Sequence, residues 1–357
     1  MASVEVDELV VPLAVGASGW DDFVEMTRVR NEIEAASVGS ELLGFPPEEL
    51  LPRWIDSHDP RRLFLARLGG RIVGRGTYEY APEPRDPVGW LTVEILPAVR
   101  RKGIGNAVFE AMDSVAREDG RTTYQTGFIS RNSSSGRRLK SPTGYGSVPA
   151  RDDGVRFALS HGFALEQVER MSALALPVSP HVLANHRAKA EHAAGSDYRV
   201  VRWEGRTPED RRDDLANLRN RMATDAPYGR LEIREETWTA ERVRDQDDLE
   251  EQSPRTMLTS AIEYVPTGRL VAFNELWTPP DTSRPVTQRD TLVLSEHRGN
   301  RLGMLVKIDN IQALAESHPG YPAINTENAE ENRYMLSVNE EVGFVAIAFE
   351  SAWRKVL

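Results

Sequence analysis

The sequence predicts a mixed α/β fold made of two similar domains in tandem. Its 357 residues suffice for about two ordinary domains. An internal repeat divides the chain in the same way. The segment GRIVG at 70–74 reappears as GRLVA at 268–272, and RRKGIG at 100–105 reappears as RGNRLG at 298–303, each after 198 residues. Because both matches share one spacing and similar flanking patterns, we interpret them as two copies of one domain.

Each copy is predicted to contain the same elements in the same order. A Gly-Arg turn joins two β-rich runs, and a third strand then leads through an arginine-rich loop into an amphipathic helix. A further strand and helix precede a Gly-Phe pair that opens the last strand. The predicted strands are 63–68, 72–80, 90–96 and 122–129 in the first copy, and 257–264, 270–277, 291–294 and 322–325 in the second. We therefore predict domains at 1–177 and 197–357, with a helical connector at 178–196.

Composition narrows the class of protein. The chain has no cysteine, which excludes disulfides, thiolate-bound metals and a cysteine nucleophile. No histidine cluster has the spacing of a metal site, so no metal is predicted. The start lacks a basic and apolar leader, and no 18-residue apolar run follows, so we expect a cytoplasmic chain with no membrane partner. A net charge of −11 disfavours nucleic acid, leaving a small-molecule partner and a monomer or homodimer.

The loop before the first amphipathic helix has the composition of a diphosphate site. The first N–H groups of a helix lack intrahelical partners and carry partial positive charge. Gly103 and Gly105 would leave room for a phosphate, and the preceding basic side chains would add charge. A glycine-rich turn with an exposed basic rim is the plainer alternative. A dinucleotide fingerprint would need glycine where Val108 stands, and neither loop has the Gly-Lys-Ser/Thr of a Walker loop.

The motif Ile95-x-Pro97-x-x-Arg100-x-x-Gly103-x-Gly105 resembles the acyl-CoA-binding signature of the GNAT superfamily of N-acetyltransferases. The order of the surrounding elements is similar as well. Because the pattern occurs twice, the resemblance covers almost the whole chain. It implies two GNAT-like acyl-CoA N-acyltransferase domains in tandem and acetyl-CoA as the cofactor.

The resemblance also implies which residues hold the cofactor. Main-chain groups of one segment in each copy would bind the pantetheine arm, and the loop would bind the pyrophosphate. In the first copy these residues are Ile95, Leu96, Pro97, Arg100, Arg101, Lys102, Gly103, Ile104, Gly105 and Asn106. In the second copy they are Val293, Leu294, Arg298, Gly299, Asn300, Arg301, Leu302 and Gly303, with Asn332 placed against the amides of the cofactor.

The second copy departs from the signature. Arg301 stands where the first glycine is expected, and its side chain would either crowd the pyrophosphate or bind it. The later helix carries an asparagine-rich stripe in the second copy, which the first copy lacks. Asn328, Asn332, Met335 and Asn339 would share one face of that helix, with Asn328 as its N-cap.

In this family the acceptor amine attacks the thioester directly, so the enzyme supplies a base rather than a nucleophile. We predict Glu94 and Asp290, on the strand before each loop, as these bases. Glu79 and Glu275 on the preceding strand would instead bind a cationic acceptor. Neither copy keeps the tyrosine that often protonates the thiolate, because Ala158 and Asn339 occupy its positions. The remaining acids are water, one of three tyrosines at positions 124, 145 and 334, or none if a copy is inactive.

The function predicted from these features is acetyl transfer from acetyl-CoA to a primary amine of a small molecule. Two alternatives remain open: a catalytically silent protein that binds or senses acyl-CoA, and a purely structural pair of domains. A Ser/Gly-rich basic insertion at 130–148 distinguishes the first copy. It is either a surface loop or a lid over the first site.

Overall fold

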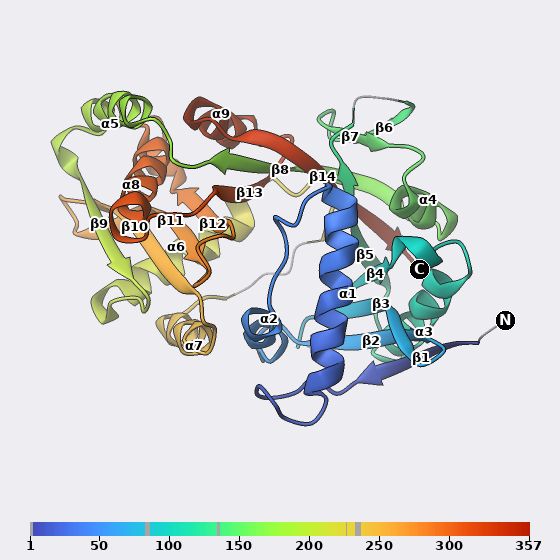
Figure 1. The fold of residues 1–357 in the computed structure, drawn as a ribbon. Coiled ribbons are helices and arrows are strands. Elements are labelled where there is room, and N and C mark those ends of the chain that lie inside the picture. Colours follow the sequence, from blue (N-terminus) through green and yellow to red (C-terminus); the bar gives the residue numbers. More distant parts are fainter. Residues whose placement is uncertain (1–2, 83–85, 134–135, 226, 233–236) are drawn as a thin grey trace. The chain divides into compact units, whose positions relative to one another are not determined.

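The computed structural model describes residues 3–82, 86–133, 136–225, 227–232 and 237–357. The chain forms two compact units, each with a β-sheet and packed helices (Figure 1). The N-terminal unit comprises Met1–Arg170, Tyr228–Glu232 and Ile347–Leu357, and the C-terminal unit comprises Met171–Pro227 and Ile233–Ala346. The predicted mixed α/β class is confirmed.

The N-terminal unit is built on a sheet with the order β1-β2-β3-β4-β5-β14, followed by the first part of β8. Neighbouring strands are antiparallel from β1 to β4, β4 and β5 are parallel, and β14 is antiparallel to β5. The elements that the chain forms before the C-terminal unit are β1 (Val4–Leu9), α1 (Trp20–Val38), α2 (Pro47–Trp54), β2 (Arg61–Leu68), β3 (Arg71–Tyr80), β4 (Val88–Ile95), α3 (Ile104–Glu118), β5 (Thr123–Arg131), β6 (Arg138–Lys140), β7 (Ser147–Pro149), α4 (Asp153–Ser160) and β8 (Ala164–Ala175).

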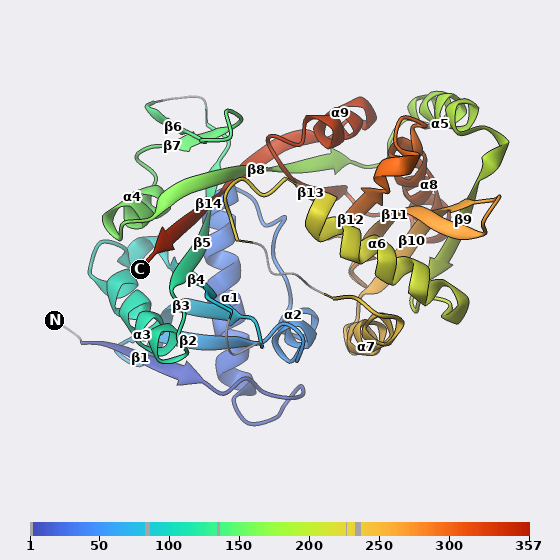
Figure 2. The ribbon, with the colours of Figure 1, turned by 180° about the vertical axis from the view of Figure 1, so that it is seen from behind.

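Helices α1 and α3 cover opposite faces of this sheet (Figures 1 and 2). Successive side chains of a strand point to opposite faces, and two neighbours on β3 show which helix lies where. The Arg75 guanidinium lies 3.5 Å from the Met26 sulfur of α1. A side chain at Gly76 would instead collide with Val108 and Met112 of α3. The amphipathic face that predicted α3 therefore packs on the sheet.

The C-terminal unit has the sheet order β13-β12-β11-β10-β9, with the end of β8 beside β13. From α5 onward the chain forms α5 (Pro180–Ala194), β9 (Tyr198–Glu204), α6 (Arg212–Asp225), α7 (Ala240–Glu250), β10 (Thr256–Tyr264), β11 (Arg269–Thr278), β12 (Val286–Val293), α8 (Leu302–Ser317), β13 (Ala323–Ala329), α9 (Arg333–Val342) and β14 (Val345–Val356). Two neighbours on β11 again identify the faces. Asn274 accepts a hydrogen bond from Asn310 of α8, and Glu275 accepts one from Arg219 of α6.

The last strand of the chain belongs to the N-terminal unit. Strand β14 pairs with β5 from Ala348↔Arg131 to Val356↔Thr123, and the fully buried Trp353 lies in the core of that unit. Conversely, Leu174 near the end of β8 is buried in the core of the C-terminal unit. The structure therefore differs from the predicted boundaries of 1–177 and 197–357, which follow the order of the chain. The predicted connector is α5, which packs on α8 within the C-terminal unit through an Arg187–Asp309 ion pair of 3.0 Å.

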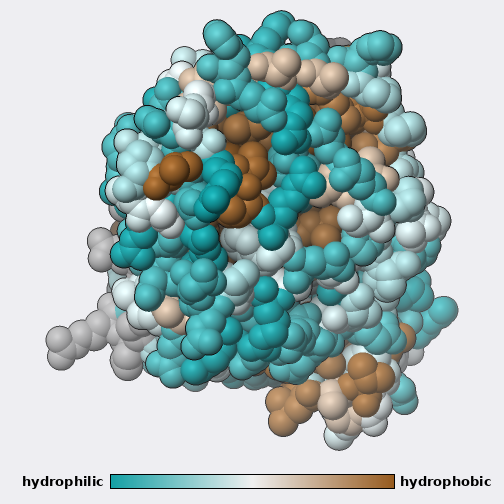
Figure 3. Space-filling model, turned by 90° about the vertical axis from the view of Figure 1, so that its left-hand side faces the viewer, coloured by the Kyte–Doolittle hydropathy of each residue, from teal (hydrophilic) through white to brown (hydrophobic). Residues whose placement is uncertain are grey.

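The surface carries scattered hydrophobic residues. On the side drawn in Figure 3, hydrophilic residues predominate and the hydrophobic ones form separate groups. The most exposed large hydrophobic side chains, Val10 and Leu13, precede α1 and are 84% and 80% exposed. Within the described ranges, every helix is too short or too polar to cross a bilayer.

Candidate functional site

In each unit, two parallel strands pair at their beginnings and then separate. The ladder between β4 and β5 ends at Trp90 and Gln125, although β4 continues to Ile95. The ladder between β12 and β13 ends at Thr287 and Asn325. The strands of both pairs therefore diverge toward their carboxyl ends, where the two arginine-containing loops follow.

The loop of the N-terminal unit presents a row of unused donors. Among the described residues, the backbone N–H groups of 101–106 donate to no other group of the protein. The first bond of α3 runs from the Ala107 N–H to the Gly103 carbonyl, at 3.1 Å. These donors lie at the N-terminus of a 15-residue helix, where the helix dipole adds partial positive charge. The loop can therefore bind an anion through its backbone, as its composition predicted.

The two glycines of this loop have different surroundings. Gly103 is the left-handed N-cap of α3, with φ at 83°, and a Cβ there would meet no atom within 4 Å. A Cβ at Gly105 would lie 3.3 Å from the Phe157 ring and close to Val93. The prediction that Gly105 leaves room for the phosphate is therefore wrong, because its side-chain position faces the protein interior. Its own N–H still belongs to the free row.

The side chains of the loop also divide by role. The Arg100 Nε donates to the Ile95 carbonyl at 2.9 Å, and its Nη1 lies 3.6 Å from the Asp153 carboxylate. Arg100 thus fastens the end of β4 to the loop. Arg101 and Lys102 are exposed. They are the cations that remain available to a bound anion.

The remaining predicted ligands of the N-terminal unit contribute mainly through their backbone. Ile104 is 1% exposed and packs in the core, so only its N–H faces the loop. The Leu96 N–H already donates to the Val73 carbonyl at 3.0 Å, and Pro97 has no N–H. Asn106 is exposed on the first turn of α3. Binding of the pantetheine arm by 95–97 stays a prediction.

The loop of the C-terminal unit keeps the same backbone shape. Arg101 and its counterpart Gly299 both have positive φ, at 65° and 90°, and Gly103 and its counterpart Arg301 do as well, at 83° and 54°. Among the described residues, the N–H groups of 299–304 also donate to no other group of the protein. A second row of free donors therefore precedes α8, and Leu302 and Gly303 lie within it.

Side chains fasten this second loop. The Arg298 Nε donates to the Val293 carbonyl at 3.1 Å, which repeats the role of Arg100. The Arg301 guanidinium donates to the Glu341 carboxylate of α9 at 2.8 Å. The Leu294 N–H is taken by the Val271 carbonyl at 3.0 Å. The Asn300 side-chain amide donates to the His297 carbonyl at 3.1 Å and so lies within the loop.

Replacing Arg301 with glycine is expected to leave coenzyme A binding at the C-terminal loop within about threefold of the wild type, because the free N–H groups remain. Glycine adopts a positive φ without strain, so the free energy of unfolding should rise by up to about 1 kcal/mol. Calorimetric titration and thermal unfolding of the variant measure both effects. A loss of binding beyond tenfold would instead make the guanidinium itself a phosphate ligand.

The predicted bases lie on the face of the sheet opposite the helix that follows each loop. Glu94 accepts a 2.5 Å hydrogen bond from the Arg75 Nε, and both side chains are largely buried. Asp290 lies on β12 at an irregularity of the ladder with β11. There Asn274 pairs with Thr291 and Leu276 pairs with Gln288, so two residues of β12 oppose Glu275 alone. This β-bulge has no counterpart in β4, whose register with β3 is continuous.

Glu275 is the most perturbed carboxyl group of the C-terminal site. It is 2% exposed, and burial raises its pKa to about 7, opposed by the Arg219 guanidinium and reinforced by the Asp290 carboxylate. Sequence reasoning placed Glu275 only as a contact for a cationic acceptor. It missed the partner Arg219, whose Nη2 donates to Oε1 of Glu275 at 2.8 Å. No local pattern marks a residue of α6 as the neighbour of β11.

The asparagine stripe predicted for one helix does not form. Helix α9 begins at Arg333, and Asn332 is its N-cap, with Oδ1 accepting the Met335 N–H at 3.2 Å. Asn328 lies on β13, and the prediction that it caps the helix is wrong. Its Oδ1 accepts from the buried Asn339 amide at 2.6 Å. Contact between Asn332 and a cofactor stays a prediction. The Asn332 Oδ1 already accepts the Met335 N–H, so its side-chain NH2 group is the part left for such a contact.

The candidate acids are placed differently from one another. The Tyr124 hydroxyl donates to the Asp113 carbonyl of α3 at 3.3 Å, and burial raises its pKa. Tyr145 and Tyr334 are exposed. The Tyr145 segment lies between the short antiparallel strands β6 and β7, so the predicted irregular insertion contains a hairpin. Residues 134–135 of that insertion lie outside the described residues.

Comparisons with known proteins agree with this geometry. Residues 27–135 match the model of the acetyltransferase (GNAT) family. The fold is similar to a tandem GNAT protein from the clavulanic acid biosynthesis pathway, with a TM-score of 0.72 and 22% identity over 99% of this chain and 98% of that one. It is also similar to a GCN5-related N-acetyltransferase from Sphaerobacter thermophilus, with a TM-score of 0.60 and 13% identity over 99% and 95%. No curated protein matches the sequence. The predicted GNAT resemblance is confirmed over residues 27–135, and the predicted tandem arrangement is confirmed as a likeness of fold.

Proposed function

We propose that this chain, which carries a GNAT acetyltransferase domain and has the fold of a tandem GNAT protein, transfers an acetyl group from acetyl-CoA to a primary amine of a small molecule. The observation that carries the proposal is the row of free N–H groups at 101–106 beside diverging strands. An anion that meets several uncrowded backbone donors at a helix N-terminus is bound without any specialised side chain.

The residues present fit coenzyme A. Gly103 leaves open space at the N-terminus of α3, and the exposed Arg101 and Lys102 add charge for a diphosphate. Acetyl-CoA supplies an acyl group activated as a thioester. The remaining tasks of this chain are to orient the acceptor, to remove a proton from its ammonium group and to exclude water. No nucleophilic side chain is needed, which agrees with a chain that has no cysteine.

The second candidate function, acyl-CoA binding without chemistry, is favoured for the N-terminal unit. Its strand β4 lacks the bulge seen in β12. Thr77 stands 198 residues before Glu275, so the corresponding position carries no carboxylate. Under this proposal the N-terminal unit binds acyl-CoA, and the C-terminal unit performs the transfer. Glu94 as a base stays a prediction.

The C-terminal unit offers a carboxylate-rich face to an acceptor. Glu275, Asp290 and Glu250 gather on the side of β11 and β12 that bears α6, together with Arg219 and Arg289. A small amine suits such a partly buried, mixed-charge environment better than a polyanion does. Asp290 remains a candidate base, and its carboxylate acts to raise the pKa of Glu275.

The direct test is acetyl-CoA consumption with a panel of primary amines. We expect release of free coenzyme A to depend on an amine and to be accompanied by its acetylated product, followed by mass spectrometry. Binding of coenzyme A without turnover of any amine would favour the silent alternative. Failure to bind at high micromolar concentration would leave only a structural pair of domains.

A further inference from the structure

Glu275 and Arg219 form a buried ion pair that leaves one polar atom of each partner unused. The two side chains are 2% and 8% exposed. Among the described residues, Oε2 of Glu275 and Nε of Arg219 are buried and have no hydrogen-bond partner. A buried carboxylate oxygen without a donor costs free energy unless it serves another group. The pair is therefore poised to receive a polar ligand.

The position of Glu275 connects it with the diverging strands. It lies opposite the bulge of β12 at 289–290, two residues beyond Thr287, the last residue that pairs with β13. Bulges re-aim side chains and are frequent beside active sites. Glu275 points to the α6 face, whereas the loop at 298–303 leads into α8 on the other face. An acceptor on the α6 face would thus meet an acyl group at the point where the strands separate.

The charges around Glu275 come from three elements. Arg219 lies on α6, Arg289 and Asp290 lie on β12, and Glu250 lies on α7, where it accepts a 2.5 Å bond from Arg289. Burial and the Asp290 carboxylate raise the Glu275 pKa to about 7, against the opposing effect of Arg219. A group that titrates near neutrality is partly ionised at pH 7, which suits a general base.

We propose that Glu275 is the proton acceptor of the C-terminal site and contacts the acceptor amine through Oε2. This inference rests on the proposed function. The Glu275 carboxylate takes one proton from the ammonium group, and the neutral amine then attacks the thioester carbonyl. The new C–N bond forms, the C–S bond breaks, and the departing thiolate takes a proton. Net, one ammonium and one thioester give one amide, one thiol and one released proton.

The test is Glu275→Gln in the full chain, with primary amines and acetyl-CoA. We expect kcat to fall about 100-fold, while coenzyme A affinity in calorimetry stays unchanged. In the wild type, kcat/KM should rise with pH through about 7. This rising limb of the pH profile should disappear in the variant. Carbon-13 NMR of labelled glutamate carboxyls should show one resonance with a midpoint near 7 that is lost in Glu275→Gln. Glu275→Asp should retain part of the activity and the limb.

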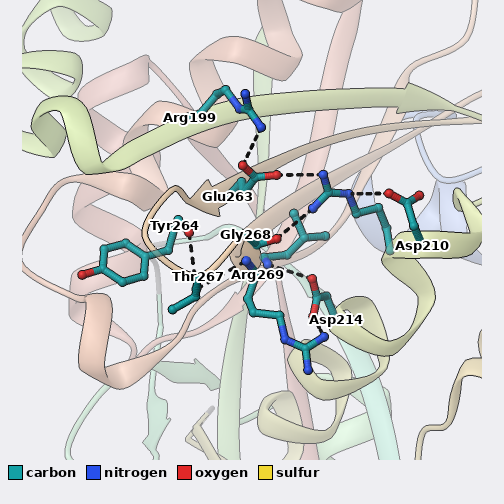
Figure 4. Close-up of polar contacts among 10 residues, drawn as sticks. Arg199, Asp210, Asp214, Glu263, Tyr264, Thr267, Gly268 and Arg269 are labelled. Atoms are coloured by element: carbon teal, nitrogen blue, oxygen red, sulfur yellow. Dashed lines mark hydrogen bonds and ion pairs between the residues drawn. The ribbon is translucent and has the colours of Figure 1, made fainter.

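Glu263 provides the matched control in the same unit. It is also buried, but Arg199 donates to it at 2.6 Å (Figure 4). Arg211 donates to its other oxygen at 2.7 Å. Burial acts to raise its pKa, and these two hydrogen bonds overcome that effect and hold it below the usual range. Glu263→Gln should therefore leave kcat and the limb near pH 7 unchanged.

The outcomes separate the two proposals. Full activity and an intact limb in Glu275→Gln, or a carboxyl that does not titrate between pH 5 and 9, would overturn the role of Glu275 and leave the transferase standing. A wild type that binds coenzyme A but acetylates no amine would refute the proposed function, and the role of Glu275 with it.

Discussion

Replacing Trp353 with alanine is expected to destabilise the N-terminal unit by about 3–5 kcal/mol, although only four residues of the sequence follow it. Trp353 is fully buried in the N-terminal core, and its indole N–H donates to the Ser351 hydroxyl at 2.9 Å. Its removal leaves a large cavity in the core of that unit. A loss of this size is comparable to the whole stability of many domains.

Hydrogen exchange locates the effect. Amides of β5, the partner of β14, should lose protection in Trp353→Ala, whereas amides of β10 and β11 should keep theirs. Val356→Ala on the same strand is the control, because Val356 is 62% exposed and should change stability by less than about 0.5 kcal/mol. Loss of protection confined to the C-terminal unit would contradict the placement of β14 in the N-terminal unit.

Replacing Lys307 with methionine is expected to stabilise the chain by on the order of 2–3 kcal/mol near pH 7. Lys307 lies on α8, is fully buried, and its Nζ has no hydrogen-bond partner among the described residues. Burial lowers its pKa from 10.5 to about 7. Folding above pH 7 therefore requires the amine to lose a proton that the unfolded chain keeps. Methionine has a similar volume and no proton to lose.

The pH dependence has a defined sign. Between about pH 7 and 10.5 the unfolded chain binds more protons than the folded chain, so this lysine makes stability rise with pH in that window, by at most ~1.4 kcal/mol per unit. Below pH 7 both states are protonated and the effect levels off. Chemical denaturation of the wild type and Lys307→Met at several pH values isolates the contribution. Lys189→Met on α5 is the exposed control. Equal pH slopes in wild type and Lys307→Met would refute the assignment.

Much of the fold could be predicted from sequence, because its signals are local. The motifs that recur after 198 residues and the apolar spacing of α3 and α8 each consist of residues that are close in the chain. The pairing of the last strand, β14, with the sheet of the N-terminal unit could not be predicted in this way. Both copies end in a similar strand, so the pattern is unchanged whichever sheet the strand joins. The pairing of β14 with β5 and the burial of Trp353 and Leu174 in different units reveal it.

The part of the site that depends on local backbone conformation could be predicted from the sequence. The loop at 100–105 has the predicted free donors, because glycine at 103 readily adopts the left-handed N-cap and adds no side chain to cover them. Gly105 and Asn332 were misplaced because their roles depend on what packs against them and on where a helix begins. Glu275 was predicted only as a contact for a cationic acceptor, and its role as a candidate base was missed. Its burial, its partner Arg219 and the bulge of β12 arise only in the assembled sheet.

Coenzyme A binding to Gly103→Glu tests whether the free backbone donors at 101–106 hold a diphosphate. A glutamate there places bulk and negative charge at the open N-terminus of α3. Gly120→Glu is the matched control, because Gly120 follows the other end of α3, has a φ of 77° and is equally open. We expect Gly103→Glu to lose one binding site in calorimetry, a loss of affinity of ~100-fold or more, while Gly120→Glu binds as the wild type does. Unchanged stoichiometry and affinity in Gly103→Glu would show that the N–H groups at 101–106 do not bind the diphosphate of coenzyme A.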